Sequence, residues 1–352
     1  MTPWIERPTI EIDSDRPVGE ALSVAPPEAL AQARGLLAAI VREVPANARW
    51  LADAARVRTG GRFQPEAAAF AGAVGATWRD VMLANLSYDL ALAALGCSTV
   101  ALPTPSGPVL ARNMDWWPED VLAQASYLIE YRRGGKLSLA NAGWPGAIGA
   151  VTGMSQRGFA LALNAALSPE GSRRTGYPVL LFLRRVLDDA ESFDAALAML
   201  RDQTLATPAL ITLVGCENRQ RVVIERTPTR HALRWGEPGK PLIATNDYRL
   251  LFAPVPSSTA EDTTASSVAS REEAVQALYE STCSRYKALC QRLADHDAGR
   301  EVDDTFLLYA LTDPAVIQSI TAQHVILRPC PQTARLFVPR KFIEPEGAIR
   351  IK

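Results

Sequence analysis

The sequence has few of the side chains on which metal, redox and nucleic-acid sites are built. It contains three histidines and five cysteines among 352 residues, no two cysteines form a Cys-x-x-Cys pair, and their count is odd. We therefore expect neither a zinc site nor a disulfide framework. The 37 basic and 38 acidic side chains give a net charge of −1, which provides no general attraction to DNA, RNA or an anionic membrane.

Long apolar runs are also missing. No stretch of the length that a membrane-spanning helix needs is free of charged residues. The first 15 residues contain acids and prolines where a secretory signal would have an apolar segment. We therefore expect a soluble cytoplasmic protein whose five cysteines are reduced thiols, and whose chemistry needs neither a metal nor an organic cofactor.

Apolar residues are abundant, at 48% of the total against 21% charged residues, so a chain of this length can bury a large core. Hydrophobic periodicity predicts helices at 27–44, 65–95 (divided in two by a cap at Thr77 and Asp80), 178–188, 192–203, 271–293 and 303–311. It predicts strands at 10–13, 97–102, 108–115, 125–132, 137–141, 147–153, 158–164, 209–216, 221–226, 231–235, 242–245, 321–328 and 334–338. The residues between 256 and 267 indicate a polar loop. Blocks of strands alternating with blocks of helices indicate an α+β fold with stacked sheets, not repeated βαβ units.

One predicted hairpin brings reactive side chains together. Its turn lies in the Pro103–Gly107 segment, and a turn centred near residue 104 or 105 places Cys97 opposite Arg112 or Asn113. Asp115 would then lie just beyond the end of the ladder. A thiol, a guanidinium and a carboxylate thus meet at one end of the hairpin, and a neighbouring guanidinium favours the thiolate. Taken alone, Cys97 also fits a buried core cysteine.

The base for such a thiol need not be a histidine. His231, His296 and His324 stand in no recognisable Cys–His motif. Cleavage of the Gly96–Cys97 bond would give Cys97 a free α-amino group, whose ordinary pKa is about 7.7–8.0. N-terminal nucleophiles use this amine as their base, and a glycine before the nucleophile lets the backbone approach closely.

Several motifs fit one known pattern in combination, although each is weak alone. They are Asn85-Leu-Ser-Tyr-Asp89, Gly96-Cys97-Ser-Thr, Ala111-Arg-Asn-Met-Asp-Trp116, Gly158-Phe-Ala-Leu-Ala-Leu-Asn164, Ala244-Thr-Asn-Asp-Tyr248 and Ser284-Arg285-Tyr286. Together they resemble the acid ceramidase and N-acylethanolamine acid amidase family of N-terminal-nucleophile (Ntn) cysteine hydrolases. That family is related to the choloylglycine (bile-salt) hydrolases and penicillin V acylases. The resemblance implies an αββα sandwich of two antiparallel sheets flanked by helices, with residues 1–96 as a helical N-terminal segment and 97–352 as the catalytic core.

The resemblance also implies roles for individual residues. Cys97 would be the nucleophile for both self-cleavage and amide attack. Arg112 and Asp115 would bind the new amino terminus and tune the thiol. Asn246 would donate a hydrogen bond to the oxyanion, and Arg285 would brace the site.

Asn164 completes the implied catalytic set. The family often has an acid after this asparagine, where this chain has Ala165, so no carboxylate is assigned to self-cleavage there. Trp116, Trp117 and Trp144 are candidates for an acyl-binding pocket, because aromatic side chains supply large apolar areas. Packing in the core is the alternative for all three.

The function implied by the resemblance is hydrolysis of the linear amide bond of small N-acyl amides with an apolar acyl group, through an acyl-thioester on Cys97. One alternative is an acyltransferase that passes the acyl group to an amine. Another is a non-catalytic lipid- or ligand-binding relative that stays uncleaved. We expect no nucleic-acid partner. We also expect the N-terminal segment to stay bound after cleavage, because the apolar faces of helices 27–44 and 65–95 would otherwise be exposed.

Overall fold

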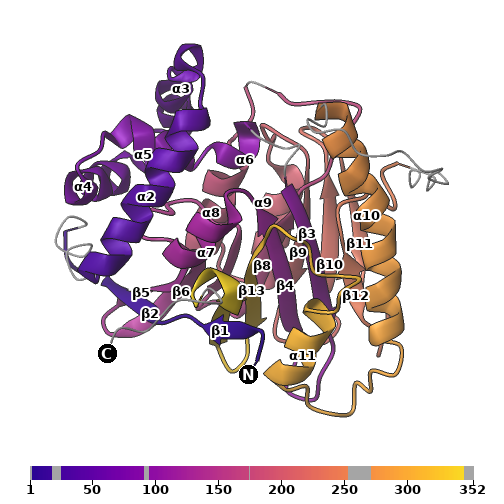
Figure 1. The fold of residues 1–352 in the computed structure, drawn as a ribbon. Coiled ribbons are helices and arrows are strands. Elements are labelled where there is room, and N and C mark those ends of the chain that lie inside the picture. Colours follow the sequence, from indigo (N-terminus) through magenta and orange to yellow (C-terminus); the bar gives the residue numbers. More distant parts are fainter. Residues whose placement is uncertain (1, 18–24, 91–94, 174, 253–270, 345–352) are drawn as a thin grey trace.

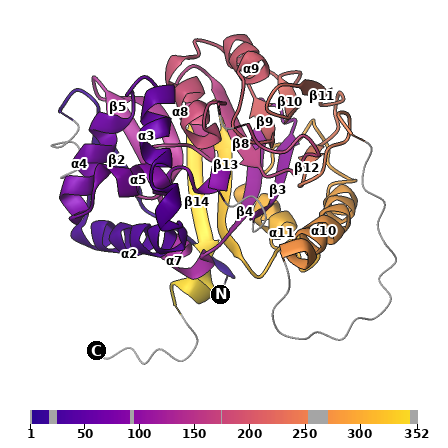
Figure 2. The same cartoon turned by 90° about the horizontal axis from the view of Figure 1, so that it is seen from above.

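Two β-sheets stacked face to face form the centre of the molecule, and helices cover the outer face of each (Figure 1). The computed structural model describes residues 2–17, 25–90, 95–173, 175–252 and 271–344. The polar loop predicted between 256 and 267 lies outside these residues. Helices α8 and α9 pack on one sheet and α10 and α11 on the other, so four layers are seen from above (Figure 2). Their bounds are α8 Val179–Asp189, α9 Phe193–Asp202, α10 Arg271–Arg292 and α11 Asp304–Leu311.

The first sheet, sheet A, has six antiparallel strands. In spatial order they are β1 (Trp4–Glu6), β14 (Thr333–Pro339), β13 (Thr321–Arg328), β4 (Val109–Trp116), β3 (Leu95–Leu102) and β12 (Leu242–Ala244). The second sheet, sheet B, has eight. They are β11 (His231–Trp235), β10 (Arg221–Arg226), β9 (Ala209–Val214), β8 (Phe159–Asn164), β7 (Thr152–Ser155), β6 (Lys136–Gly143), β5 (Tyr127–Arg133) and β2 (Thr9–Asp13). Sheet B departs from the expected antiparallel pattern at one edge, where β2 runs parallel to β5.

The N-terminal segment contributes to both sheets as well as forming a helical group beside them (Figure 1). Strand β1 completes the edge of sheet A beside β14, and β2 completes the edge of sheet B beside β5. The helices of this region are α2 (Pro27–Glu43), α3 (Leu51–Arg58), α4 (Gln64–Val74), α5 (Trp78–Ala84) and α6 (Ser87–Leu90), with a short 3-10 turn at Ala46–Ala48. Edge strands tie the segment to the core by backbone hydrogen bonds in addition to apolar packing.

The predicted helix 65–95 is divided more finely than the sequence indicated. Gly75 ends α4 in a left-handed conformation with φ 67°, which glycine adopts without strain. Thr77 and Asp80 form the expected capping box at the start of α5. Residues 91–94, at the end of the predicted helix, lie outside the described part of the chain. The sequence analysis also missed α3, β1, a short helix α7 (Glu119–Ala125) and a 3-10 turn at Arg340–Phe342.

The strand predicted at 147–153 begins only at Thr152. The preceding residues form a loop, and side chains bond to several of its backbone groups. The Asn85 side-chain oxygen accepts from the Gly149 N–H at 2.9 Å, and Asn141 donates to the carbonyls of Ala147 and Gly149. The Asn85 and Asn141 side chains therefore satisfy backbone groups of this loop that a strand would pair with its neighbours.

The β3–β4 hairpin forms as predicted, but its register was predicted wrongly. Cys97 pairs with Met114, and Leu102 pairs with Val109 in the last rung. The turn therefore centres between residues 105 and 106 and not at 104 or 105. Asp115 lies within the ladder, opposite Gly96, and not beyond its end. A turn with several prolines does not fix its own centre, and the register follows the burial of the flanking strands.

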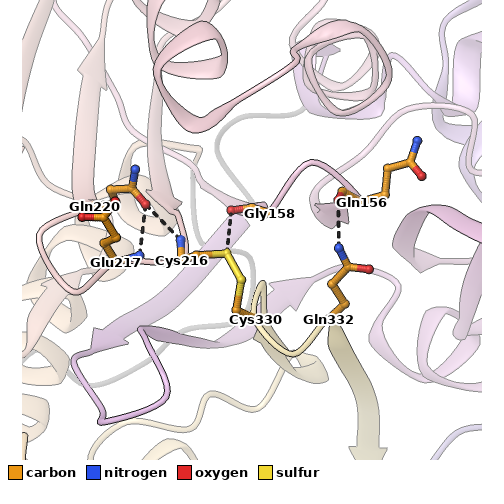
Figure 3. The surroundings of a disulfide bond; sticks show 7 residues. All are labelled: Gln156, Gly158, Cys216, Glu217, Gln220, Cys330 and Gln332. Atoms are coloured by element: carbon orange, nitrogen blue, oxygen red, sulfur yellow. Dashed lines mark hydrogen bonds between the residues drawn. A yellow bond between two sulfur atoms is a disulfide. The ribbon is translucent and has the colours of Figure 1, made fainter.

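The prediction that all five cysteines are reduced is also wrong. Cys216, after β9, forms a disulfide with Cys330, in the turn between β13 and β14 (Figure 3). The disulfide links a turn of sheet A to a turn of sheet B, and 114 positions separate its cysteines in the sequence. Cys97, Cys283 and Cys290 are free. In the described residues, no helix combines the length and apolar character needed to cross a bilayer.

Candidate active site

Cys97 lies near the start of β3, with its side chain in the space between the two sheets. It is 3% exposed. The Arg112 guanidinium donates to the Cys97 Sγ atom at 2.5 Å and to the Thr152 hydroxyl on β7 of sheet B at 2.8 Å. Arg112 is two residues from Met114, the cross-strand partner of Cys97, so both side chains share one face of the hairpin. The predicted contact between the Cys97 thiol and the Arg112 guanidinium is therefore present, although the register of the hairpin differs from the predicted one.

Two opposing effects act on the thiol. Burial raises the pKa of Cys97 above its ordinary value, while the nearby Arg112 and Arg285 guanidinium groups oppose that rise. The negative charge of Asp115 adds to the effect of burial on this pKa. Within the folded chain the thiol therefore holds its proton, and a base that removes the proton is required for nucleophilic attack.

Asp115 lies on the opposite face of the hairpin from Cys97. Its Oδ1 atom accepts a hydrogen bond from the Thr321 hydroxyl at 2.6 Å. Its Oδ2 atom is buried and has no hydrogen-bond partner among the described residues. Burial raises the pKa of Asp115, and Arg285, Thr321 and Arg112 oppose this shift. The residue that pairs with Gly96 across the ladder thus has one unused acceptor.

Arg285 and Asn246 hold the backbone of Cys97. Arg285, on α10, donates from Nη1 to the Cys97 carbonyl at 2.6 Å and from Nη2 to Asn246 Oδ1 at 2.8 Å. The same Asn246 oxygen accepts from the Cys97 N–H at 3.0 Å, and Asn246 Nδ2 donates to the Ala165 carbonyl at 2.8 Å. Both ends of the Asn246 amide are therefore fixed, and one of its two N–H groups has no acceptor in the hydrogen bonds of the described residues.

Asn164 supports this network without a hydrogen bond to Cys97. At the end of β8, it accepts from the Thr99 hydroxyl at 2.6 Å and donates to the carbonyls of Ala244 and Thr245. These bonds hold the chain that leads into Asn246. The structure thus joins Cys97, Arg112, Asn246 and Arg285 in one hydrogen-bonded network. Asn164 is connected to this network through the backbone next to Asn246. Asp115 lies on the other face of the strand.

No histidine takes part in this network. His324 is buried and bonds through Nδ1 to Asn113 Oδ1 at 2.7 Å, and burial lowers the pKa of His324 to about 4. His296 bonds to the Pro103 carbonyl in the turn between β3 and β4, and the backbone of His231 pairs with Arg226 in sheet B. In the hydrogen bonds of the described residues, none of the three reaches Cys97.

An apolar pocket begins beside this network. Met114, the cross-strand partner of Cys97, is part of its wall, and α2 of the N-terminal segment closes another side. All three tryptophans singled out in the sequence line it; Trp116 and Trp144 are nearly buried, whereas Trp117 is 45% exposed. The lining residues are Leu36, Ile40, Ala84, Asn85, Ser87, Met114, Trp116, Trp117, Leu122, Ala142, Gly143, Trp144, Ala147, Gly149, Val151, Leu180 and Gln323.

Sequence reasoning missed several residues that build the site. Thr152 holds Arg112, Thr282 accepts from the Asn246 backbone N–H at 2.7 Å, and Gln323 lines the pocket. Asn85 and Asp89 are polar residues in an otherwise apolar helical stretch, and they belong to one of the quoted motifs but received no role. That contrast was the available signal, because a polar side chain in an apolar helix is retained when it has a buried partner.

Asp89 is a polar side chain with such buried partners. Its carboxylate accepts from the Val179 N–H, at the first residue of α8, and from the Thr207 hydroxyl at 2.7 Å. Burial raises the pKa of Asp89 from 3.8 to about 6, with those hydrogen bonds and the charge of Arg58 opposing it. The folded protein therefore binds this proton more tightly than the unfolded chain does.

We expect Asp89 to make folding pH-dependent. Because its pKa is raised on folding, its stabilising effect is complete below pH 3.8 and is lost as the pH rises through about 6. Asp89→Asn, which stays neutral, should remove up to about 3 kcal/mol from the change in stability between pH 4 and pH 7. Urea unfolding of both proteins at the two pH values measures this difference. An identical pH dependence in the variant would show that the carboxyl titrates normally.

The stacked sheets, their outer helices and the cysteine at the start of a central strand define the chain as having the Ntn-hydrolase fold. A family model described as acyl-coenzyme A:6-aminopenicillanic acid acyl-transferase matches residues 102–306, which is more than half of the chain. The chain belongs to this family.

Curated relatives agree with the resemblance noted in the sequence. An N-acylethanolamine-hydrolyzing acid amidase of Caenorhabditis elegans is 23% identical over 178 residues, covering 46% of this chain and 50% of that protein. An acid ceramidase of Balaenoptera acutorostrata scammoni is 23% identical over 190 residues, covering 47% of each. The chain spans about half the length of the curated relatives it matches.

A solved structure confirms the fold. The Caenorhabditis elegans N-acylethanolamine-hydrolyzing acid amidase ortholog superimposes with a TM-score of 0.51 at 17% sequence identity. The superposition covers 66% of this chain and 93% of that one. The predicted α+β sandwich with outer helices is therefore correct.

Proposed function

We propose that this protein is a cysteine amidohydrolase that cleaves small N-acyl amides with an apolar acyl group, after the Gly96–Cys97 bond has been cut. The observation that carries the proposal is the arrangement around Cys97. Arg112 holds the sulfur, Asn246 and Arg285 hold the backbone N–H and carbonyl of the same residue, and an apolar pocket opens at its neighbour Met114. The relatives named as an acid amidase and an acid ceramidase support the same chemistry.

Self-cleavage would use the same sulfur. The Cys97 thiol loses its proton and attacks the Gly96 carbonyl carbon, the C–N bond breaks, and the nitrogen takes up a proton to become the free amine of Cys97. Water then hydrolyses the resulting thioester, which releases the Gly96 carboxylate and restores the thiol. Arg285 holds the Cys97 carbonyl during these steps. The unused Asp115 oxygen lies across from Gly96, where it can accept an N–H of the new terminus.

In the amidase reaction the new amine replaces a histidine as the base. It takes the thiol proton, the sulfur attacks the substrate carbonyl carbon, and the proton passes to the leaving amine as the C–N bond breaks. Water hydrolyses the acyl-thioester. The Asn246 oxygen accepts one N–H of the amine and so fixes the direction of its lone pair, while Arg112 stabilises the thiolate. The remaining Asn246 N–H is the proposed donor to the oxyanion.

Product analysis tests this function and its closest alternative. Purified protein is incubated with N-acyl amides of increasing chain length, and the released acid and amine are quantified by mass spectrometry. Acid and amine in equal amounts, with loss of the activity after thiol alkylation, are expected. The family description favours one second candidate, an acyltransferase. A new amide formed in preference to the acid when an amine acceptor is added would identify that activity. Absence of every product in a cleaved protein would contradict both.

We also propose that residues 1–96 and 97–352 are the two parts of the mature protein and stay associated. The N-terminal part supplies β1 and β2 to the two sheets. Glu66, on α4, accepts a hydrogen bond from Tyr131 on β5 at 2.7 Å and pairs with the buried Arg184 at 3.5 Å. Leu36 and Ile40 of α2 close the pocket. Dissociation would expose this pocket and leave Arg184 with fewer partners.

The expected result of cleavage is therefore a change in covalent structure without a change in size. Denaturing electrophoresis should show two fragments, whereas native gel filtration should show one species of about 38.1 kDa or a multiple of it. Urea should separate the fragments only as the protein unfolds, because strands and core are shared. A free 97–352 fragment that stays folded in native buffer would contradict the association.

A further inference from the structure

Gln323 lies in line with the nucleophile on the floor of the apolar pocket. Across sheet A, Gln323 on β13 pairs with Met114 on β4, and Met114 pairs with Cys97 on β3. Directly opposed residues of antiparallel strands point to the same face, so the three side chains form one row facing sheet B. Two strand spacings place Gln323 about 10 Å from Cys97 along this row.

The Gln323 side chain uses only one end of its amide. Its Nε2 atom donates to the Ser126 hydroxyl oxygen at 2.7 Å. The single hydroxyl hydrogen of Ser126 is donated to the Leu122 carbonyl at 2.6 Å, so Ser126 can only accept from Gln323. This fixes the orientation of the amide. Gln323 Oε1 is left buried and has no partner among the described residues, and the whole residue is 0% exposed.

Asn85, a second amide in the pocket wall, does not compensate for the unpaired Gln323 oxygen. The Asn85 oxygen accepts from Gly149, and its nitrogen donates to the carbonyls of Val81 and Gly146. Among the described residues, no acidic side chain lines the pocket. A buried acceptor without a partner costs about 1–3 kcal/mol, and a bound ligand that supplies a donor recovers part of this cost. A cationic donor would instead be desolvated without a counter-charge.

We propose that this pocket selects acyl groups that carry a neutral hydrogen-bond donor, a hydroxyl or an N–H several bonds from the scissile carbonyl, which donates to Gln323 Oε1. The inference rests on the proposed function for its reaction, and it narrows the substrate class from plain alkyl amides to hydroxylated or amide-bearing ones. Gln323 contacts the acyl group and not the reacting atoms, so it determines specificity and leaves the chemical step unchanged.

The kinetic test uses medium-chain amides of one fluorogenic amine. Their acyl groups are identical except for a hydroxyl at successive carbons. At the best position we expect kcat/KM to exceed that of the plain acyl amide by about tenfold. Gln323→Met, which keeps the length and removes the acceptor, should bring the ratio to about one. Leu122→Met, in the same pocket, should leave the ratio unchanged.

A binding test separates this inference from the proposed function. Cys97→Ala is titrated with the same amides while the fluorescence of the pocket tryptophans is followed, with and without Gln323→Met. Tighter binding of a hydroxylated amide that disappears with Gln323→Met supports the inference even if no amide is hydrolysed. Equal binding of all the amides, or a hydroxyl preference that survives Gln323→Met, overturns it. Hydrolysis without any preference would leave the amidase proposal standing and refute the role of Gln323.

Discussion

Cys97→Ala is expected to remain a single 38.1 kDa chain and to lose amidase activity by at least about 10⁴-fold. Both effects have the same cause, because one sulfur is the proposed nucleophile for self-cleavage and for the substrate. The variant removes a buried side chain held by Arg112 and leaves the backbone contacts of Asn246 and Arg285 in place. Intact mass, N-terminal sequencing and product assays measure the two effects.

The free cysteines of α10 provide the matched control. Cys290 is exposed, so Cys290→Ala should cleave itself and turn over substrate like the wild type. A new amino terminus at Cys97 in this control and in the wild type, and its absence in Cys97→Ala, are the expected pattern. A chain that stays whole in every buffer but binds acyl amides would favour the non-catalytic ligand-binding alternative. Full activity of Cys97→Ala would refute the mechanism.

Asn246→Ala should lower kcat by about 10²–10³-fold, the usual effect of losing an oxyanion donor. It removes two things at once, the free N–H and the oxygen that accepts from the Cys97 nitrogen. Asn246→Asp separates them, because an aspartate keeps acceptors for Cys97 and Arg285 but has no N–H to offer. Steady-state kinetics on protein of confirmed cleavage state give both values.

If the oxyanion role is correct, Asn246→Asp is as inactive as Asn246→Ala. Near wild-type turnover by Asn246→Asp would instead show that Asn246 only orients the amine. Asn218→Ala is the control, since Asn218 bonds to the backbone of Thr104 at the turn of the β3–β4 hairpin, away from Cys97. We expect it to lower stability modestly and to leave kcat unchanged.

Local signals in the sequence were enough to find the main elements and the hairpin that carries Cys97, the proposed nucleophile. The alternation of apolar residues located most strands, and the capping box at Thr77 and Asp80 divided the helical run as expected. The Gly-Cys-Ser-Thr and Arg-Asn-Met-Asp motifs placed Cys97 and Arg112 on adjacent strands, which the structure confirms. Cys97 and Arg112 are in contact although their register was predicted wrongly, because residues at diagonal positions of two paired strands share a face.

Pairings between segments far apart in the chain could not be predicted from the sequence. The Cys216–Cys330 disulfide joins turns of two different sheets, and neither cysteine stands in a motif that names its partner. The parallel pairing of β2 with β5 likewise depends on how the chain returns after the N-terminal helices. Such contacts arise from packing across the whole molecule, so spacing along the chain carries little information about them.

The sequence by itself determined the fold class, the strand that carries Cys97, the proposed nucleophile, and the family to which the chain belongs, since these depend on local periodicity and on motifs of adjacent residues. Only the tertiary structure decided which groups surround Cys97 and what its pocket offers a substrate. Asn246, Arg285 and Gln323 come from three separate parts of the chain. The unpaired oxygen of Gln323 could be identified only from the tertiary structure, because whether a buried acceptor has a hydrogen-bond partner depends on which residues lie around it.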